Sequence, residues 1–271
     1  MSFKRELEVV VISDVHLGTY GCHAKQLLQY LKSIRPKTLI LNGDIIDIWN
    51  FRKSYFPSTH MDVIRRIMKM ASRGTKVIYI TGNHDDLLRK YTDVEFGNLL
   101  IADKYFLEID GKKAWIFHGD VFDNTTKGSA KMLARLGGKG YDWLIILNRI
   151  VNWILERFGK DKLSLSKQVK NSVKKAVSWI NNFETTAAEL AIEKKYDYVI
   201  CGHIHKHQIR EIKNESGSVI YLNSGDWVEN LTALEYDDRK WTIYQYDEKN
   251  TSIIDDDNEI QLDFLTKILA S

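Results

Sequence analysis

The chain has 271 residues, of which 44% are hydrophobic and 28% are charged, and its formal net charge is +3. This composition is typical of a globular protein with a sizeable core and argues against extended disorder. The two cysteines, Cys22 and Cys201, argue against a disulfide framework, and the N-terminus lacks the apolar segment of a signal peptide. The most apolar stretch, residues 141–158, is interrupted by charged and amide side chains, so we expect a cytoplasmic protein that does not span a membrane.

The first half of the chain alternates strand and helix patterns. Short apolar, β-branched runs at residues 8–13, 38–41 and 77–81 predict buried strands. Between them lie an apolar helical face that extends to Ile34 and is ended by Pro36, and a helix over residues 61–72 that Gly74 ends. Strand–helix–strand at this spacing predicts parallel βαβ units with right-handed crossovers.

The second half predicts further strands on either side of a long helical segment. Residues 104–109 and 112–117 read as a hairpin closed by Asp110-Gly111, and strands return at residues 198–201, 208–213, 219–223, 231–236 and 241–246. The predicted organisation is an α/β core of residues 1–123 and 196–247, a basic amphipathic helical insertion at residues 124–195, and an acidic tail at residues 248–271.

The positive charge is concentrated in the insertion. Between Thr125 and Ile180 the sequence holds twelve lysines and arginines but three acids, a net charge of +9 that leaves −6 for the rest of the chain. Such segregation indicates an anionic partner for this segment.

Five short polar clusters each follow a predicted strand directly. They are Asp14-Val15-His16, Gly43-Asp44 with Asp47 close behind, Gly82-Asn83-His84-Asp85, His118-Gly119-Asp120 and Gly202-His203-Ile204-His205. Because ligands gather at the carboxyl ends of the strands in α/β sheets, we expect the five clusters to converge. One such residue alone is usually a cap or a turn residue, but five in order argue against that interpretation.

The residue types in these clusters indicate a metal centre. Asp, His and Asn are suited to Mn²⁺, Fe²⁺ or Zn²⁺, and the absence of cysteine argues against a structural zinc site. The i, i+2 pairs Asp14/His16 and His203/His205 would point the same way in an extended segment. Asp44, next to Gly43, is the natural bridge between two metals. Two metals about 3.5–4 Å apart can hold a hydroxide and clamp a phosphoryl group for in-line attack.

The ordered motifs D-x-H, G-D-x-x-D, G-N-H-D, H-G and G-H-x-H resemble those of the calcineurin-like metallophosphoesterase superfamily. The resemblance implies a four-layer α/β/β/α sandwich and two metal ions, Mn²⁺ being favoured over Fe or Zn. It assigns Asp14, His16, Asp44 and His205 to one metal and Asp44, Asn83, His118 and His203 to the other. It also implies that His84 assists the leaving group and that Asp47 orients His84. Loop hydrogen bonding is the alternative role for Asp47 and Asp85.

A narrower resemblance concerns the segments SDVHLG, LNGDIIDIW, TGNHDDLLR, FHGD, CGHIHKHQIREI and LNSGDW. They are similar to UDP-2,3-diacylglucosamine pyrophosphatases, which act in lipid A synthesis, over residues 8 to 246. This implies a nucleotide-lipid substrate that is cleaved to UMP and lipid X by a metal-bridging hydroxide. It further implies that the insertion is a lid over the acyl chains. The chain departs from that family at His84, where the characterised enzymes carry Arg, and in the loop Val121–Thr126.

The insertion has residues that suit a lid. Trp143 and Trp153 belong to an apolar helix that can hold acyl chains, and Lys167 and Lys170 can meet phosphate or the inner-membrane surface. The alternative is an insertion that packs on its own domain with a solvated basic face.

Two other functions remain in consideration. Basic residues could follow a nucleic-acid backbone in a nuclease or general phosphodiesterase, but apolar residues dominate the first helix of the insertion and make nucleic acid the weaker choice. A metal-free scaffold on the same fold would be expected to lack ligands, whereas all seven are present here. No G-x-G-x-x-G follows the first strand and no G-x-S-x-G occurs, so dinucleotide-binding and serine-hydrolase motifs are absent.

Overall fold

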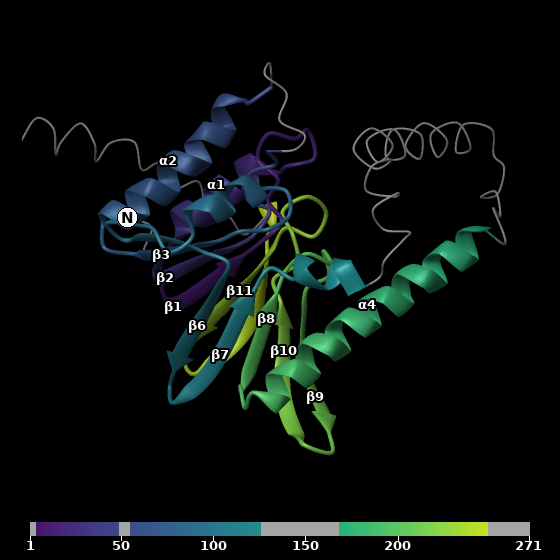
Figure 1. The fold of residues 1–271 in the computed structure, drawn as a ribbon. Helices are drawn as coiled ribbons and strands as arrows, with labels where there is room; N and C mark the ends of the chain where they lie inside the picture. The colour runs from purple at the N-terminus through teal and green to yellow at the C-terminus, as the bar shows by residue number, and fades with distance from the viewer. Residues whose placement is uncertain (1–3, 49–54, 126–167, 249–271) are drawn as a thin grey trace, which may run out of the picture. The chain divides into compact units, whose positions relative to one another are not determined.

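The computed structural model describes residues 4–48, 55–125 and 168–248. Within these ranges the chain folds into two mixed β-sheets with helices, which agrees with the predicted α/β class (Figure 1). Trp143, Trp153 and Lys167 lie outside the described residues. Lys170 belongs to a described helix, but its side chain is not described, so the predicted contacts of the lid stay predictions.

The first sheet has seven strands in the order β12-β11-β1-β2-β3-β5-β4. Its central strands β1, β2, β3 and β5 are parallel, which confirms the predicted βαβ units, while β4, β11 and β12 pair antiparallel. The strands are β1 Arg5–Ile12, β2 Ile34–Asn42, β3 Lys76–Ile80, β4 Glu95–Phe96, β5 Leu99–Ala102, β11 Thr232–Asp237 and β12 Lys240–Gln245.

The second sheet has five strands in the order β6-β7-β8-β10-β9. β7 and β10 flank β8 in parallel, and the predicted β6–β7 hairpin is present, with Asp110 and Gly111 both at positive φ. The strands are β6 Lys104–Ile109, β7 Lys112–Phe117, β8 Tyr198–Cys201, β9 Gln208–Asn214 and β10 Gly217–Asn223.

Alternate residues of the central strands face two different apolar layers. Val10 and Ile12 of β1 pack with helices α1 (Ala24–Ser33) and α2 (Ser58–Ser72), whereas Val9 and Val11 pack with residues of the second sheet. Both faces of the parallel strands are therefore buried, which explains why their sequences are continuous apolar runs. This packing fixes the carboxyl ends of strands from both sheets at one end of the core.

The boundary between α1 and β2 differs from the prediction. The helix ends at Ser33, and Ile34 and Pro36 belong to β2. Pro36 pairs with Leu7 of β1 on one side, but β3 begins only opposite Thr38, so the missing N–H breaks no bond of the β2–β3 ladder. The Thr75 hydroxyl donates to the Pro36 carbonyl at 2.9 Å.

The structure also contains short elements that were not predicted. They are β4, β5 and two 3₁₀ helices, η1 (Asp86–Tyr91) and η2 (Asp120–Thr125). Runs this short carry too few residues for a periodicity to distinguish them from loops.

The chain divides into two compact units, Met1–Gly119 with Ala191–Ser271 and Asp120–Leu190. Most of helix α4 (Gln168–Glu193) belongs to the second unit, in which the rings of Phe122 and Phe183 meet edge to face at 5.5 Å. No helix of the described ranges is long and apolar enough to cross a membrane. The predicted metal ligands, together with His84 and Asp47, all belong to the first unit.

Candidate metal centre

The five polar clusters follow the carboxyl ends of β1, β2, β3, β7 and β8, as expected. Backbone hydrogen bonds join neighbouring loops within each sheet. The Asp14 N–H donates to the Gly43 carbonyl at 3.1 Å, and the Gly202 N–H donates to the His118 carbonyl at 2.9 Å. Side-chain oxygens reinforce these links, because Asp44 Oδ1 accepts from the His84 N–H at 2.8 Å and Asp14 Oδ2 accepts from the His203 N–H at 3.0 Å.

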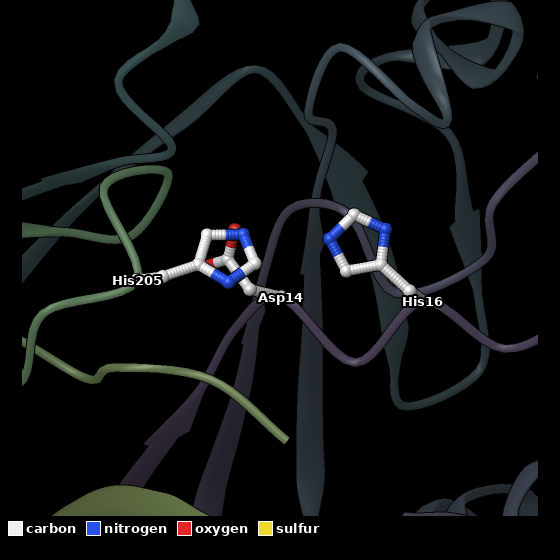
Figure 2. Close-up of side chains that lie close together, drawn as sticks. All are labelled: Asp14, His16 and His205. Atoms are coloured by element: carbon white, nitrogen blue, oxygen red, sulfur yellow. The ribbon is translucent and has the colours of Figure 1, made fainter. Parts of the chain in front are cut away.

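Asp14, His16 and His205 form what we call the outer group. One ligand atom from each of the three lies within 4.8 Å of the other two. His205 Nε2 is 3.3 Å from Asp14 Oδ1, and the His16 and His205 rings are stacked with their centroids 5.5 Å apart. Figure 2 shows two of these side chains on the segment after β1 and the third, His205, reaching them from another segment.

Asp44, His118 and His203 form the inner group, which meets the same 4.8 Å criterion. His118 Nε2 is 3.2 Å from Asp44 Oδ2, so the two residues are close enough to touch a common ion. The other ring nitrogen of His118, Nδ1, lies 2.8 Å from the Asn42 carbonyl and must donate to it, because a carbonyl can only accept. In a neutral ring this leaves the Nε2 lone pair facing a carboxylate, an arrangement that needs a proton or a cation between them.

A third set of atoms, from His16, Asp44 and His84, also lies within 4.8 Å and links the two groups. His16 belongs to the outer group and Asp44 to the inner one, so the whole forms one continuous cluster. Asp44 therefore occupies the position expected of a shared ligand.

The donor set fits divalent cations. Asp14 Oδ1, His16 Nε2 and Asn83 Oδ1 are buried and have no hydrogen-bond partner among the described residues. Buried polar atoms are normally paired, and a carboxylate oxygen, an imidazole nitrogen and an amide oxygen are all ligands for borderline metals. These three atoms belong to three of the predicted ligands. Asn83 supplies the amide oxygen that the prediction included.

The surroundings of Asp44 favour its ionised form, the form in which a carboxylate binds a metal. Burial raises the pKa of its carboxyl, but the charge and hydrogen bond of His118, with the charges of His16 and His84, outweigh burial and lower the pKa far below its ordinary value. Burial of this side chain is therefore offset by the imidazoles around it.

His84 and Asp47 lie beside the cluster. Asp47 Oδ2 is 3.1 Å from His84 Nδ1 and 3.3 Å from His16 Nδ1, so one buried carboxylate faces both rings. Burial lowers the pKa of His84, but the hydrogen bond to Asp47 and the charges of Asp44 and Asp47 outweigh this, and the net pKa is raised. The His84 side chain is 26% exposed, which leaves it accessible to a substrate.

The backbone of the site differs from the extended conformation that the i, i+2 spacing suggested. Asp14, His16, Asp44, His203 and His205 all have positive φ, between 51° and 69°. This left-handed region is uncommon for residues with a Cβ and is concentrated at functional sites. The pairs Asp14/His16 and His203/His205 therefore reach the cluster through tight left-handed bends. They do not use the alternation of side chains along a strand.

Gly43 and Gly82 allow the loops to approach one another. Gly43 has φ +81°, and a Cβ there would lie 2.3 Å from His118 Nδ1. A Cβ on Gly82 would lie 2.3 Å from Asp44 Oδ1 and 2.6 Å from the Asp44 backbone nitrogen. Any larger residue at either position would displace a predicted ligand of the inner group.

A family model described as calcineurin-like phosphoesterase matches residues 7–207 of this chain. The chain belongs to the calcineurin-like phosphoesterase family. It is a metal-dependent phosphoesterase, a hydrolase with a candidate dinuclear His/Asp site for divalent metal ions.

Relatives of this phosphoesterase include UDP-2,3-diacylglucosamine hydrolases. The one from Aliivibrio fischeri is 24% identical, over 88% of this chain and 98% of the relative, and one from Vibrio cholerae is 23% identical over the same shares. Among solved structures, a phosphoesterase from E. coli aligns with a TM-score of 0.45 at 14% identity, over 91% of this chain and 96% of that one.

Two further carboxylates support the phosphoesterase site. Asp85 accepts hydrogen bonds from the Ile45 N–H at 2.9 Å, the Gly82 N–H at 2.6 Å and the Tyr79 hydroxyl at 2.6 Å. It therefore ties the loops after β2 and β3 together, which is the loop hydrogen bonding considered as its alternative role.

Asp226 was not singled out from the sequence. Its side chain is fully buried, and Oδ2 lies 3.8 Å from His205 Nδ1. Asp226 accepts from the backbone N–H groups of Val228 and Asn230, and the Asn230 amide donates to the His205 carbonyl at 3.0 Å. The polar run after β10, within LNSGDW, was the available signal, because it also follows a parallel strand of the second sheet.

Proposed function

We propose that this phosphoesterase hydrolyses the pyrophosphate bond of UDP-2,3-diacylglucosamine and releases UMP and 2,3-diacylglucosamine 1-phosphate. The observation that carries the chemistry is the continuous cluster in which Asp44 links the outer and inner groups beside His84. Support for the substrate comes from relatives that match almost from end to end and are named as hydrolases of this nucleotide-lipid.

Seven residues would hold the two divalent ions: Asp14, His16 and His205 with Asp44 at one position, and Asn83, His118 and His203 with Asp44 at the other. When bound, such ions lower the pKa of a water molecule and neutralise charge on phosphoryl oxygens; Mn²⁺ suits the oxygen and imidazole donors. The protein's own contribution is to hold these donors in place, which the His118–Asn42 hydrogen bond supports, and to keep the Asp44 carboxylate ionised, which its lowered pKa supports.

His84 would donate a proton to the departing phosphate oxygen. Its raised pKa increases the protonated fraction near neutral pH, and Asp47 holds the ring by its Nδ1, which leaves Nε2 for the substrate. A cation bound at Asp44 would reduce that residue's effect on His84, but the contact with Asp47 would persist. Asp47 is therefore the positioning residue in this proposal.

The lipid half of the substrate would be met by the insertion. We assign Trp143 and Trp153 to the acyl chains and Lys167 and Lys170 to phosphate or to the membrane surface, on the composition of that segment. The protein would then work in the cytoplasm at the inner-membrane surface, where such a substrate is found.

The test is UMP release from UDP-2,3-diacylglucosamine by the purified full-length chain with Mn²⁺. We expect release that EDTA abolishes and that His84→Asn reduces at least about 100-fold, since a positioned general acid contributes about 10²–10⁴-fold. His23→Asn, outside the site, serves as the matched control and should retain wild-type activity.

A different result would separate the substrate from the chemistry. Hydrolysis of bis-p-nitrophenyl phosphate without UMP release would show that the nucleotide-lipid assignment is wrong and that the phosphoesterase acts on another phosphoester. Because p-nitrophenolate leaves without a proton, His84→Asn should affect that substrate far less than the nucleotide-lipid.

A further inference from the structure

The loops that carry the ligands of the outer and inner groups continue side by side past the metal centre. Leu17 and Ile46 form an isolated parallel bridge beyond the ends of β1 and β2. The Leu17 N–H donates to the Ile45 carbonyl, and the Asp47 N–H donates to the Leu17 carbonyl, both at 2.9 Å. The segment that follows Leu17 therefore starts beside the site.

Two tyrosines meet just past the first of these loops. Tyr20 follows the first loop and Tyr55 precedes α2, and their ring centroids are 3.8 Å apart with an angle of 38° between the planes. Tyr20 is 66% exposed, so its ring adds little to the core. An exposed aromatic ring held against another is available to contact a ligand.

The inner end of this aromatic pair is anchored in the core. The Tyr55 ring meets His60 edge to face, and His60 in turn meets Phe56, which packs on the apolar core. His60 is buried, and its Nδ1 accepts from the Gly18 N–H at 2.9 Å. This hydrogen bond ties the start of α2 to the loop that carries His16, so the tyrosine pair and the outer group are fixed relative to each other.

The short sequence separation keeps Tyr20 close to the outer group. Tyr20 is four residues after His16, so their Cα atoms are at most about 14 Å apart. The loop is shortened further, because Thr19 donates to the His16 carbonyl from both its N–H, at 3.2 Å, and its hydroxyl, at 2.8 Å. The base of a nucleotide whose phosphate lies at the outer group is therefore within reach of the Tyr20 side chain.

We propose that Tyr20, supported by Tyr55, is a stacking platform for the nucleobase of the nucleotide half of the substrate. Stacking on an aromatic ring requires a flat ligand surface, and the base is the flat part of a nucleoside phosphate. This subsite rests on the proposed function for its ligand class, a nucleoside phosphate, and it lies apart from the residues assigned to the lipid half.

The test uses two inhibitors of bis-p-nitrophenyl phosphate hydrolysis by the Mn²⁺-loaded protein, UMP and ribose 5-phosphate. Both carry the phosphate and the ribose, but only UMP carries a base. We expect UMP to inhibit the wild-type protein more strongly. Tyr20→Ala should raise the inhibition constant of UMP about tenfold and leave that of ribose 5-phosphate unchanged.

Two conservative variants and one control isolate the ring. Tyr20→Phe should keep the preference for UMP, because the aromatic face remains, whereas Tyr20→Leu should lose it as Tyr20→Ala does. Phe106→Ala, which removes an aromatic residue of similar exposure, 52%, from β6, should leave both inhibition constants unchanged.

The proposal is overturned if the two compounds inhibit the wild-type protein equally, or if Tyr20→Ala weakens both to the same extent. Its failure can be told from that of the proposed function. Preference for UMP without cleavage of UDP-2,3-diacylglucosamine would refute the lipid substrate and keep the platform. Cleavage of that substrate without preference for UMP would refute the platform alone.

Discussion

The outer and inner groups of the candidate metal centre each combine two buried residues with one half-buried histidine, but they differ in how the histidine that faces the carboxylate is held. In the inner group the side chains of His118 and Asp44 are 0% and 3% exposed, whereas His205 of the outer group is 37% exposed. The inner ring is also locked by its hydrogen bond to the Asn42 carbonyl. The His118–Asp44 pair of the inner group is therefore fixed before any cation arrives, while the matching Asp14–His205 pair of the outer group includes a half-exposed ring, and we expect the inner group to bind its cation more tightly.

Asp44→Asn should have the largest effect, because this substitution removes the charge that both groups share. We expect the hydrolysis of bis-p-nitrophenyl phosphate to fall by more than about 100-fold and the bound metal, measured by elemental analysis, to fall for both positions. Glu215→Gln, an exposed acid in the β9–β10 turn, is the control. Retention of two tightly bound ions by Asp44→Asn would contradict the shared role.

His118→Ala and His205→Ala compare the groups directly. His205→Ala should weaken one cation by about 10–100-fold, and raised Mn²⁺ should restore part of the activity, because the lost ligand lies where solvent can replace it. His118→Ala should not recover at high Mn²⁺, since it leaves a buried gap beside Asp44. Activity measured against Mn²⁺ concentration distinguishes the two, and equal rescue of both variants would refute the difference between the groups.

Asp226→Asn should produce a smaller loss that is confined to the outer group. Asparagine keeps an acceptor for the backbone N–H groups but removes the negative charge near His205, so we expect up to about tenfold weaker Mn²⁺ activation with little change in thermal stability. A thermal melt beside the Mn²⁺ titration checks this. A large drop in melting temperature with unchanged Mn²⁺ affinity would instead make Asp226 a purely structural residue.

Asp47→Asn should change the pH profile more than the maximum rate. The contact with Asp47 raises the pKa of His84, and a general acid is active below its pKa, so activity is lost as the pH rises through that value. Removing the carboxylate lowers the pKa, and the alkaline limb of kcat should move to lower pH. The pH profile must be measured with a substrate that has a poor leaving group, so that the proton from His84 is needed. An alkaline limb that stays at the same pH would show that Asp47 does not set the pKa of His84.

The sequence was sufficient to predict the parallel strands and the meeting of five loops at their ends. Both follow from apolar runs of the right length, each followed at once by Asp, His or Asn, because the topology of parallel strands leaves only one edge for those residues. The same logic placed Asp44 and His118 together, and their side chains are 3.2 Å apart.

Other features depended on contacts that no local pattern contains. Pro36 reads as a helix terminator, yet it is tolerated in β2 because the neighbouring strand β3 starts two residues later. The left-handed bends at Asp14 and His16 are imposed by hydrogen bonds to the loop after β2, and not by the residues themselves. The contact of Asp226 with His205 joins loops that are 21 positions apart in the sequence, so spacing alone could not reveal it.

The left-handed backbone of the proposed ligands lowers the stability of the fold at positions that are needed for activity. Each of Asp14, His16, Asp44, His203 and His205 adopts a conformation that costs a residue with a Cβ about 1 kcal/mol or more, and that glycine adopts freely. Selection for thermal stability alone would therefore favour glycine at His16, His203 and His205, three of the proposed ligands, whereas the carboxylates of Asp14 and Asp44 also join the loops by hydrogen bonds that glycine would remove. A library of variants screened only for folding should be enriched in such substitutions. The enriched variants should have the highest thermal stability and the lowest phosphoesterase activity in the library.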